Sequence, residues 1–152
     1  MNKSSKYISW ACVLFWMALI FYLSHQPATE SNELSTGITE LIKQFIERVM
    51  PHIAIDISTL NFIIRKGAHF FAYLVLGVLV INALWASGFK GWRMAGVAFV
   101  ICVSYAITDE VHQLFIPGRS GEIRDVIIDS AGALVGISIY YLLRSAYGIN
   151  KT

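Results

Sequence analysis

Residues 104–136 read SYAITDEVHQLFIPGRSGEIRDVIIDSAGALVG, with charges placed where one apolar run ends and the next begins. The first run ends in two acids, and the second begins at Asp125. A Pro-Gly turn lies between them, so the polar ends of both runs face one loop. If both runs are transmembrane helices, their charged ends lie together at one membrane surface.

The composition of the chain is that of a membrane protein. Of its 152 residues, 56% are hydrophobic and 14% are charged, whereas a soluble domain carries about 25% charged residues. The net charge of +2, without any run of Lys or Arg, argues against a nucleic-acid partner. Cys12 and Cys102 lie inside apolar runs, so we interpret both as buried hydrophobic residues and predict neither a disulfide nor a zinc site.

Four apolar runs approach or exceed the length of about 20 residues that a bilayer needs. We expect one domain over 1–152, an all-α integral membrane bundle whose four transmembrane helices cover about 7–23, 68–86, 94–113 and 125–144. No cleavage site of the A-x-A type follows the first run, so it is interpreted as a span and not as a signal peptide. The short GFKGWR connection makes the second and third spans antiparallel neighbours.

The polar segment 24–67 contains an amphipathic pattern. Apolar residues recur at three- and four-residue steps, which predicts a helix of about four turns that ends before Pro51. Its apolar face either packs on the bundle or lies in the headgroup layer; a lid over a substrate is the alternative. The following helix is expected to begin near Ser58 as the N-cap. The members of the apolar face are Leu34, Ile38, Leu41, Ile42, Phe45, Ile46 and Val49.

Charged residues that flank the spans give a weak orientation signal. More Lys and Arg lie on the side of the two termini, and all ten Asp and Glu lie on the other side. We therefore expect cytoplasmic termini, with segment 24–67 and the polar cluster outside the cytoplasm. The basic residues on the side of the termini are Lys3, Lys6, Lys90, Arg93, Arg144 and Lys151.

The spacing of polar residues along each predicted helix shows which of them share a face. Glu110 and Gln113 share a face at i, i+3, and Asp109 shares the adjacent face with His112. On the second span, polar side chains at i, i+3 and i+7 share one face; they are Lys66, His69 and Tyr73. On the fourth span, one face carries two acids and a G-x-x-x-G that allows close backbone approach; its residues are Asp125, Asp129, Gly132 and Gly136.

Three interpretations of this cluster remain open. An ion-pair network, with Arg119 and Lys66 neutralising the acids, would hold the helices in register. An anion site would use Lys66, Arg119 and Arg124 to receive a phosphate. Catalysis would use a general base and a histidine as acid or metal ligand. Glu110 and His112 are two residues apart and point to different sides of their helix, so no metal motif is present and we predict no metal or other cofactor.

Three blocks of sequence resemble the VanZ-like family: SHQP at 24–27, KGAHFFAYLVLG at 66–77 and DEVHQLFIPGRSGEIRDVIIDSAGALVG at 109–136. The last block is the specific one, because its E-x-x-Q, P-G-R and D-x-x-x-D match the family pattern in order and spacing. One departure is Asp129, where that pattern more often has Asn. By resemblance, the family's polar positions are Lys66, His69, Tyr73, Glu110, Gln113, Arg119, Asp125 and Asp129.

The resemblance implies a multi-pass protein of the bacterial cytoplasmic membrane connected with resistance to glycopeptide antibiotics such as teicoplanin. We expect it to bind or act on an anionic envelope lipid or lipid-linked cell-wall component at the outer face. The expected ligand-binding residues are Lys66, Tyr73, Gln113, Arg119 and Asp125, and the candidate catalytic residues are Glu110, Asp129 and His69. Two alternatives are a membrane hydrolase or transferase with Glu110 as base and a non-catalytic scaffold for envelope enzymes. The oligomeric state is left open.

Overall fold

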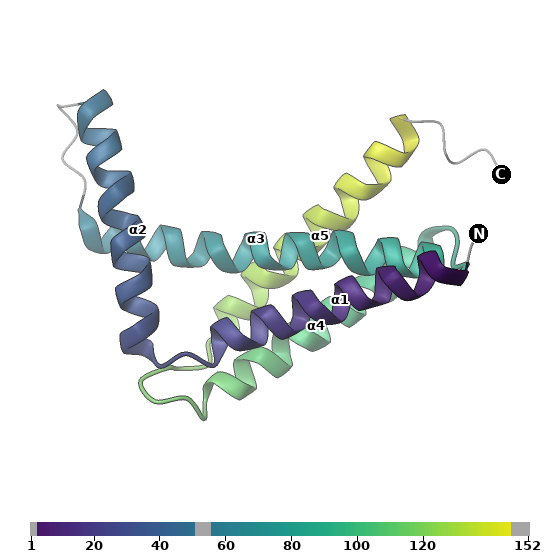
Figure 1. Cartoon of the computed structure of the whole chain (residues 1–152), viewed down its shortest axis with the longest axis horizontal. Coiled ribbons are helices and arrows are strands. Elements are labelled where there is room, and N and C mark those ends of the chain that lie inside the picture. Colours follow the sequence, from purple (N-terminus) through teal and green to yellow (C-terminus); the bar gives the residue numbers. More distant parts are fainter. Residues whose placement is uncertain (1–2, 51–55, 147–152) are drawn as a thin grey trace.

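Helices make up nearly all of the part of the chain that the computed structural model describes, residues 3–50 and 56–146 (Figure 1). They are α1 (Lys3–Ser24), α2 (Ala28–Val49), α3 (Ile57–Ala86), α4 (Trp92–Gln113) and α5 (Ile123–Ala146). Four of them, α1, α3, α4 and α5, are long and apolar enough to cross a membrane. This confirms the predicted all-α bundle with four spans and a further helix between the first and the second.

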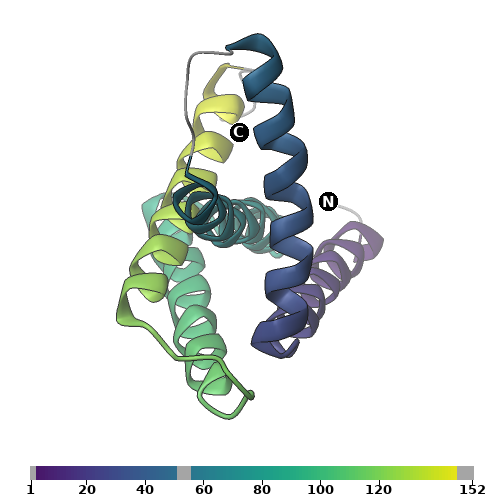
Figure 2. The ribbon, with the colours of Figure 1, turned by 90° about the vertical axis from the view of Figure 1, so that its left-hand side faces the viewer.

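The helix α2 lies across one end of the bundle, whereas α1, α3 and α4 run along its length (Figure 1). Figure 2 looks onto that end and shows α2 passing beside the beginning of α3. The loop between α4 and α5 lies at the same end, and the first turn of α1 and the last turn of α5 lie at the other (Figure 1). The end of α4 and the beginning of α5, which carry most of the predicted polar residues, therefore lie at the end of the bundle that α2 crosses.

Two helix boundaries differ from the prediction. The side chain of Asp56 accepts a hydrogen bond from the backbone N–H of Thr59 at 2.9 Å, so Asp56, and not the predicted Ser58, is the N-cap of α3. Hydrogen bonds from the hydroxyls of Ser58 and Thr59 hold the pKa of the Asp56 carboxyl well below its usual range. The helix α2 has 22 residues, about six turns, because it begins directly after Pro27 with Glu30 in its first turn. The prediction counted only the apolar part.

The helices α3 and α5 touch through glycine. A Cβ atom added at Gly132 would lie 2.1 Å from the carbonyl oxygen of Phe70, and one at Gly136 would lie 2.0 Å from that of Leu74. On the opposing helix, a Cβ at Gly77 would lie 2.5 Å from the carbonyl oxygen of Ala133. The predicted close backbone approach at the G-x-x-x-G is thus confirmed, and the neighbour is α3 of the same chain.

The helix α2 attaches to α3 by its polar side. Its buried residues are Ser35 and Thr39, and its Asn32 accepts a hydrogen bond from Arg65 of α3 at 3.0 Å. The predicted apolar face points away from this contact, since Leu41 is 67% exposed and Phe45 is 68% exposed. Most of this face therefore does not pack on the bundle in the described structure.

Candidate functional site

The polar cluster combines the first half of α3, the end of α4, the α4–α5 loop and the first turns of α5. Four acids and the amide of Gln113 are almost fully buried: Asp109, Glu110, Gln113, Asp125 and Asp129 are each at most 6% exposed. Polar groups with so little access to water need partners inside the protein. The partners that the structure provides therefore show which of the side chains compensate one another.

Lys66 is neutralised within the protein. Its ammonium group lies 2.5 Å from a carboxylate oxygen of Asp125 and 3.3 Å from one of Glu122. Glu122 also accepts a hydrogen bond from Arg124 at 2.9 Å, and this bond, together with Lys66, lowers the pKa of Glu122. Two of the three bases predicted for an anion site, Lys66 and Arg124, are thus engaged by acids. Glu122, absent from the predicted site, is a member of the cluster.

Arg119 has a different environment, made of neutral oxygens. Its guanidinium donates to the backbone carbonyls of Gln26 at 2.7 Å and Leu23 at 3.1 Å, and to the side-chain oxygen of Gln113 at 3.3 Å. Among the described residues, no carboxylate forms a salt bridge with it. Burial lowers the pKa of Arg119, and the neighbouring Arg65 lowers it further, although an arginine remains charged at neutral pH. The predicted ion-pair network therefore includes Lys66 and not Arg119.

Two cavities adjoin at the junction of α2 and α3. The larger has a volume of about 330 Å³, the smaller about 180 Å³, and Arg65, His69 and Arg119 line both. The larger is mainly apolar and is lined among others by Ile20, Leu23, Leu34, Ile38, Ile64, Ala68 and Ala72. The smaller is polar and is lined among others by Asn32, Lys66, Gln113, Ser120, Glu122 and Asp125. The boundary between an apolar and a polar space thus carries two guanidinium groups.

Arg65 was not among the predicted site residues, because the sequence offered it only as a charge flanking a span. The spacing held a signal, since Arg65 and His69 are four residues apart and so share a helical face. The structure gives Arg65 a neutral partner, the side-chain oxygen of Asn32. Like Arg119, it forms no salt bridge with a described carboxylate.

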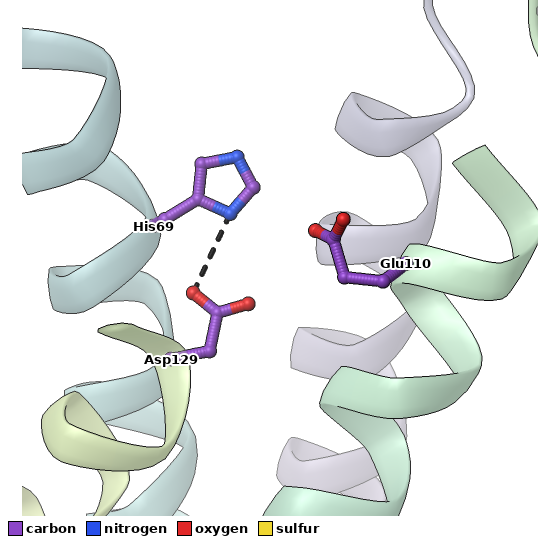
Figure 3. Close-up of side chains that lie close together, drawn as sticks. All are labelled: His69, Glu110 and Asp129. Carbon is purple, nitrogen blue, oxygen red and sulfur yellow. Dashed lines mark ion pairs between the residues drawn. The ribbon is translucent and has the colours of Figure 1, made fainter. Parts of the chain in front are cut away.

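His69, Glu110 and Asp129 converge from α3, α4 and α5 (Figure 3). One nitrogen or oxygen of each lies within 4.8 Å of those of the other two. The ring nitrogen Nδ1 of His69 lies 3.4 Å from a carboxylate oxygen of Asp129. Glu110 accepts hydrogen bonds from Gln113 at 3.1 Å and from the backbone N–H of Glu122 at 2.8 Å. Such a group can form an ion pair, share a proton or bind a cation.

The remaining predicted residues are close to this group. Tyr73 is 1% exposed, and no described residue forms a hydrogen bond with its hydroxyl. Asp109 accepts a hydrogen bond from Ser24 of α1 at 2.8 Å. At the exposed rim, nitrogens of His25 and His112 lie 3.1 Å apart. The end of α1 is therefore joined to the end of α4 by side-chain contacts.

Comparison with known protein families decides the classification of the chain. A model of the VanZ/LLP1 family matches residues 9–144, nearly the whole length. The chain belongs to the VanZ/LLP1 family. No curated protein and no solved structure matches it significantly. The resemblance drawn from the sequence blocks is thereby confirmed at the level of the family.

The three VanZ-like sequence blocks meet in the cluster. The SHQP block supplies Ser24, which donates to Asp109, and the carbonyl of Gln26, which accepts from Arg119. The second block supplies Lys66 and His69 on α3, and the third supplies the acids that form ion pairs with them. In this VanZ/LLP1 protein, residues that are distant in sequence therefore form one site at one end of a membrane bundle.

Proposed function

We propose that this VanZ/LLP1 protein binds an anionic lipid of the cell envelope, or a lipid-linked cell-wall component, at the outer face of the bacterial cytoplasmic membrane. The observation that carries the proposal is the pair of arginines, Arg65 and Arg119, shared by an apolar and a polar cavity. An anionic lipid has the same order of parts along the molecule: an apolar chain, then a charged group, then a polar headgroup. The proposed orientation follows the charge bias of the loops.

The charges favour an anion at this position over a cation. Lys66 already contacts two carboxylates, whereas the contacts of Arg65 and Arg119 are with neutral oxygens. The exposed Arg65 and the partly buried Arg119 repel each other, and a phosphate between them would remove that repulsion. Arginine also presents several N–H groups in a plane, which suits the oxygens of a phosphate.

The apolar cavity accounts for the lipid part of the ligand. Its volume of about 330 Å³ is at the lower end of the range of about 300–1,000 Å³ for ligand pockets. It therefore fits the portion of an acyl chain next to the headgroup, with the remainder in the bilayer. Leu34 and Ile38 of α2 line this cavity, so a helix in the headgroup layer covers the chain where it enters.

Neutral substitutions of the two arginines test the proposal. Arg65→Gln and Arg119→Gln are each expected to weaken phosphatidylglycerol binding by at least about tenfold, because a hydrogen bond to a charged group contributes about 1.5–3 kcal/mol. Native mass spectrometry of the purified protein with added lipid measures the change. Arg48→Gln, which removes the same charge from an exposed position on α2, is the matched control and should bind like the wild type.

Two further arms make this test specific. Inorganic phosphate should compete only weakly, because it has no chain to fill the apolar cavity. Teicoplanin susceptibility of cells expressing each variant should follow lipid binding if the link to glycopeptide resistance holds. Unchanged lipid binding in the Arg65→Gln/Arg119→Gln double variant would show that the arginines do not hold the headgroup.

An enzyme acting on lipid-linked groups is the second candidate. Both oxygens of Glu110 accept hydrogen bonds, which disfavours it as the general base. The oxygens of Asp129 have no hydrogen-bond partner among the described residues, so Asp129 beside His69 is the better candidate. Lipid extracts of expressing and non-expressing cells distinguish the two functions, because only an enzyme changes the lipid species. The scaffold alternative loses its expected surface, since Gly132 and Gly136 pack on α3.

A further inference from the structure

The group of His69, Glu110 and Asp129 combines features that neither lipid binding nor helix packing requires. The three side chains come from three helices and point toward one another (Figure 3). Their potential ligand atoms all lie within 4.8 Å of one another. We infer that they form a binding site for a divalent transition-metal ion, Zn²⁺ or Mn²⁺. This inference does not depend on the proposed lipid function.

The carboxylate of Asp129 is the independent observation that points to a ligand. Asp129 is 0% exposed, and neither of its oxygens forms a hydrogen bond with any described residue. The contact of 3.4 Å to His69 is an ion pair only when the imidazole is protonated. Leaving a buried carboxylate without partners costs several kcal/mol by order of magnitude. A metal ion between Asp129 and His69 would remove this cost.

The charges of the surroundings leave room for a divalent cation. Glu110 and Asp129 are 5% and 0% exposed and together carry two negative charges when ionised. The nearby Lys66 is already paired with Asp125 and Glu122. A divalent ion would balance both carboxylates while the imidazole stays neutral, which is the form in which histidine binds metals.

The donor atoms select the class of metal. One imidazole nitrogen and two carboxylate oxygens suit Zn²⁺ and Mn²⁺, whereas Cu⁺ and iron–sulfur clusters prefer thiolates. The carboxylate of Glu110 is held by Gln113 and by the backbone of Glu122, and such outer contacts orient metal ligands. Three protein ligands leave a position open for water or another oxygen. His69 lines both cavities and so connects the ion site to them.

Metal titration of the full chain in detergent tests the inference. The protein is stripped with EDTA, and ZnCl₂ or MnCl₂ is then added while the melting temperature and the bound metal are measured. The wild type should bind about one ion per chain and melt at a higher temperature with metal. Asp129→Asn and His69→Ala should bind at least about 100-fold more weakly, beyond the loss of roughly 10–100-fold expected for an outer contact.

Matched controls keep the result interpretable. Asp109→Asn neutralises another buried acid of α4 outside the group, and His112→Ala removes one histidine of the exposed pair; both should bind metal like the wild type. Glu110→Gln is a second ligand variant in case Asp129→Asn does not fold. The inference would be overturned if the wild type bound neither ion, or if Asp129→Asn bound metal as tightly as the wild type. His69 and Asp129 would then form an ion pair only. Lipid binding of the same samples reports on the proposed function separately.

Discussion

Replacing Gly132 or Gly136 with Ala is expected to lower the free energy of unfolding by about 1–3 kcal/mol per position, the usual cost of overpacking. The added methyl group would lie 2.1 Å from the carbonyl oxygen of Phe70 at the first position and 2.0 Å from that of Leu74 at the second. Both obstacles are backbone atoms, so a side-chain rotation cannot relieve them. The helices α3 and α5 must move apart, which also disturbs the contacts that set the polar cluster. Unfolding in a mixed detergent series measures the change.

The same substitution at Gly96 of α4 is the matched control. Apart from its chain neighbours and the adjacent backbone of α4, no described atom lies within 4 Å of a Cβ built there, and Ala favours a helix over Gly by about 0.5–1 kcal/mol. Gly96→Ala is therefore expected to be neutral or stabilising. Equal effects at Gly96, Gly132 and Gly136 would contradict the close contact of α3 and α5.

Replacing Lys66 with Met is expected to cost about 3–5 kcal/mol, the loss that follows when one partner of a buried ion pair is removed. The side chains of Lys66 and Asp125 are 17% and 9% exposed, so the carboxylate would keep little access to water. The matched control is Lys43→Met. Lys43 pairs with Glu47 on α2 at 3.5 Å, with side chains 27% and 47% exposed, and a surface pair contributes less than about 1 kcal/mol.

A double variant shows whether the cost comes from the unpaired charge. Adding Asp125→Asn to Lys66→Met should restore part of the lost stability, because the buried carboxylate is then neutral. Thermal unfolding of the wild type, Lys66→Met, Asp125→Asn and the double variant in one detergent gives the coupling energy between Lys66 and Asp125. If the losses of stability of the two single variants add up in the double variant, or if Lys66→Met is as stable as Lys43→Met, the Lys66–Asp125 pair does not stabilise the fold.

The spans were predictable because each is a long apolar run. Their helices extend beyond the predicted spans where charged residues continue the helix: α1 begins at Lys3, although the predicted span began at 7. The start of α3 at Ile57 is close to the helix start expected near Ser58. The length of α2 was underestimated because the prediction counted only its apolar residues.

Contacts between helices were not predictable. Spacing placed Glu110 beside Gln113 on one helix, and the structure shows a hydrogen bond between them. It could not show that Lys66 contacts Asp125, 59 residues away. It also could not show that Arg65 and Arg119 are the basic residues of the site that form no salt bridge with a described carboxylate. Glu122 was missed because a loop acid has no pattern of its own, and Arg65 was missed because it was counted only as a charge flanking a span.

The candidate metal ligands show the same limit. His69, Glu110 and Asp129 lie on three helices, and a motif search reads ligand spacing along one segment. The presence of an acid inside the bundle was nevertheless a signal in itself, because ionisable residues in membrane spans usually have a function. The sequence therefore indicated which acids to consider, and the packing of the helices shows which side chains lie together.

The most direct test of the account is the preference of the wild-type protein between two lipids with identical acyl chains, phosphatidylglycerol and phosphatidylcholine, measured by native mass spectrometry. If Arg65 and Arg119 hold an anionic headgroup, the anionic lipid should bind at least about tenfold more tightly. This preference should disappear in the Arg65→Gln/Arg119→Gln variant and persist in Arg48→Gln. Equal binding of the two lipids by the wild type would contradict the proposed function.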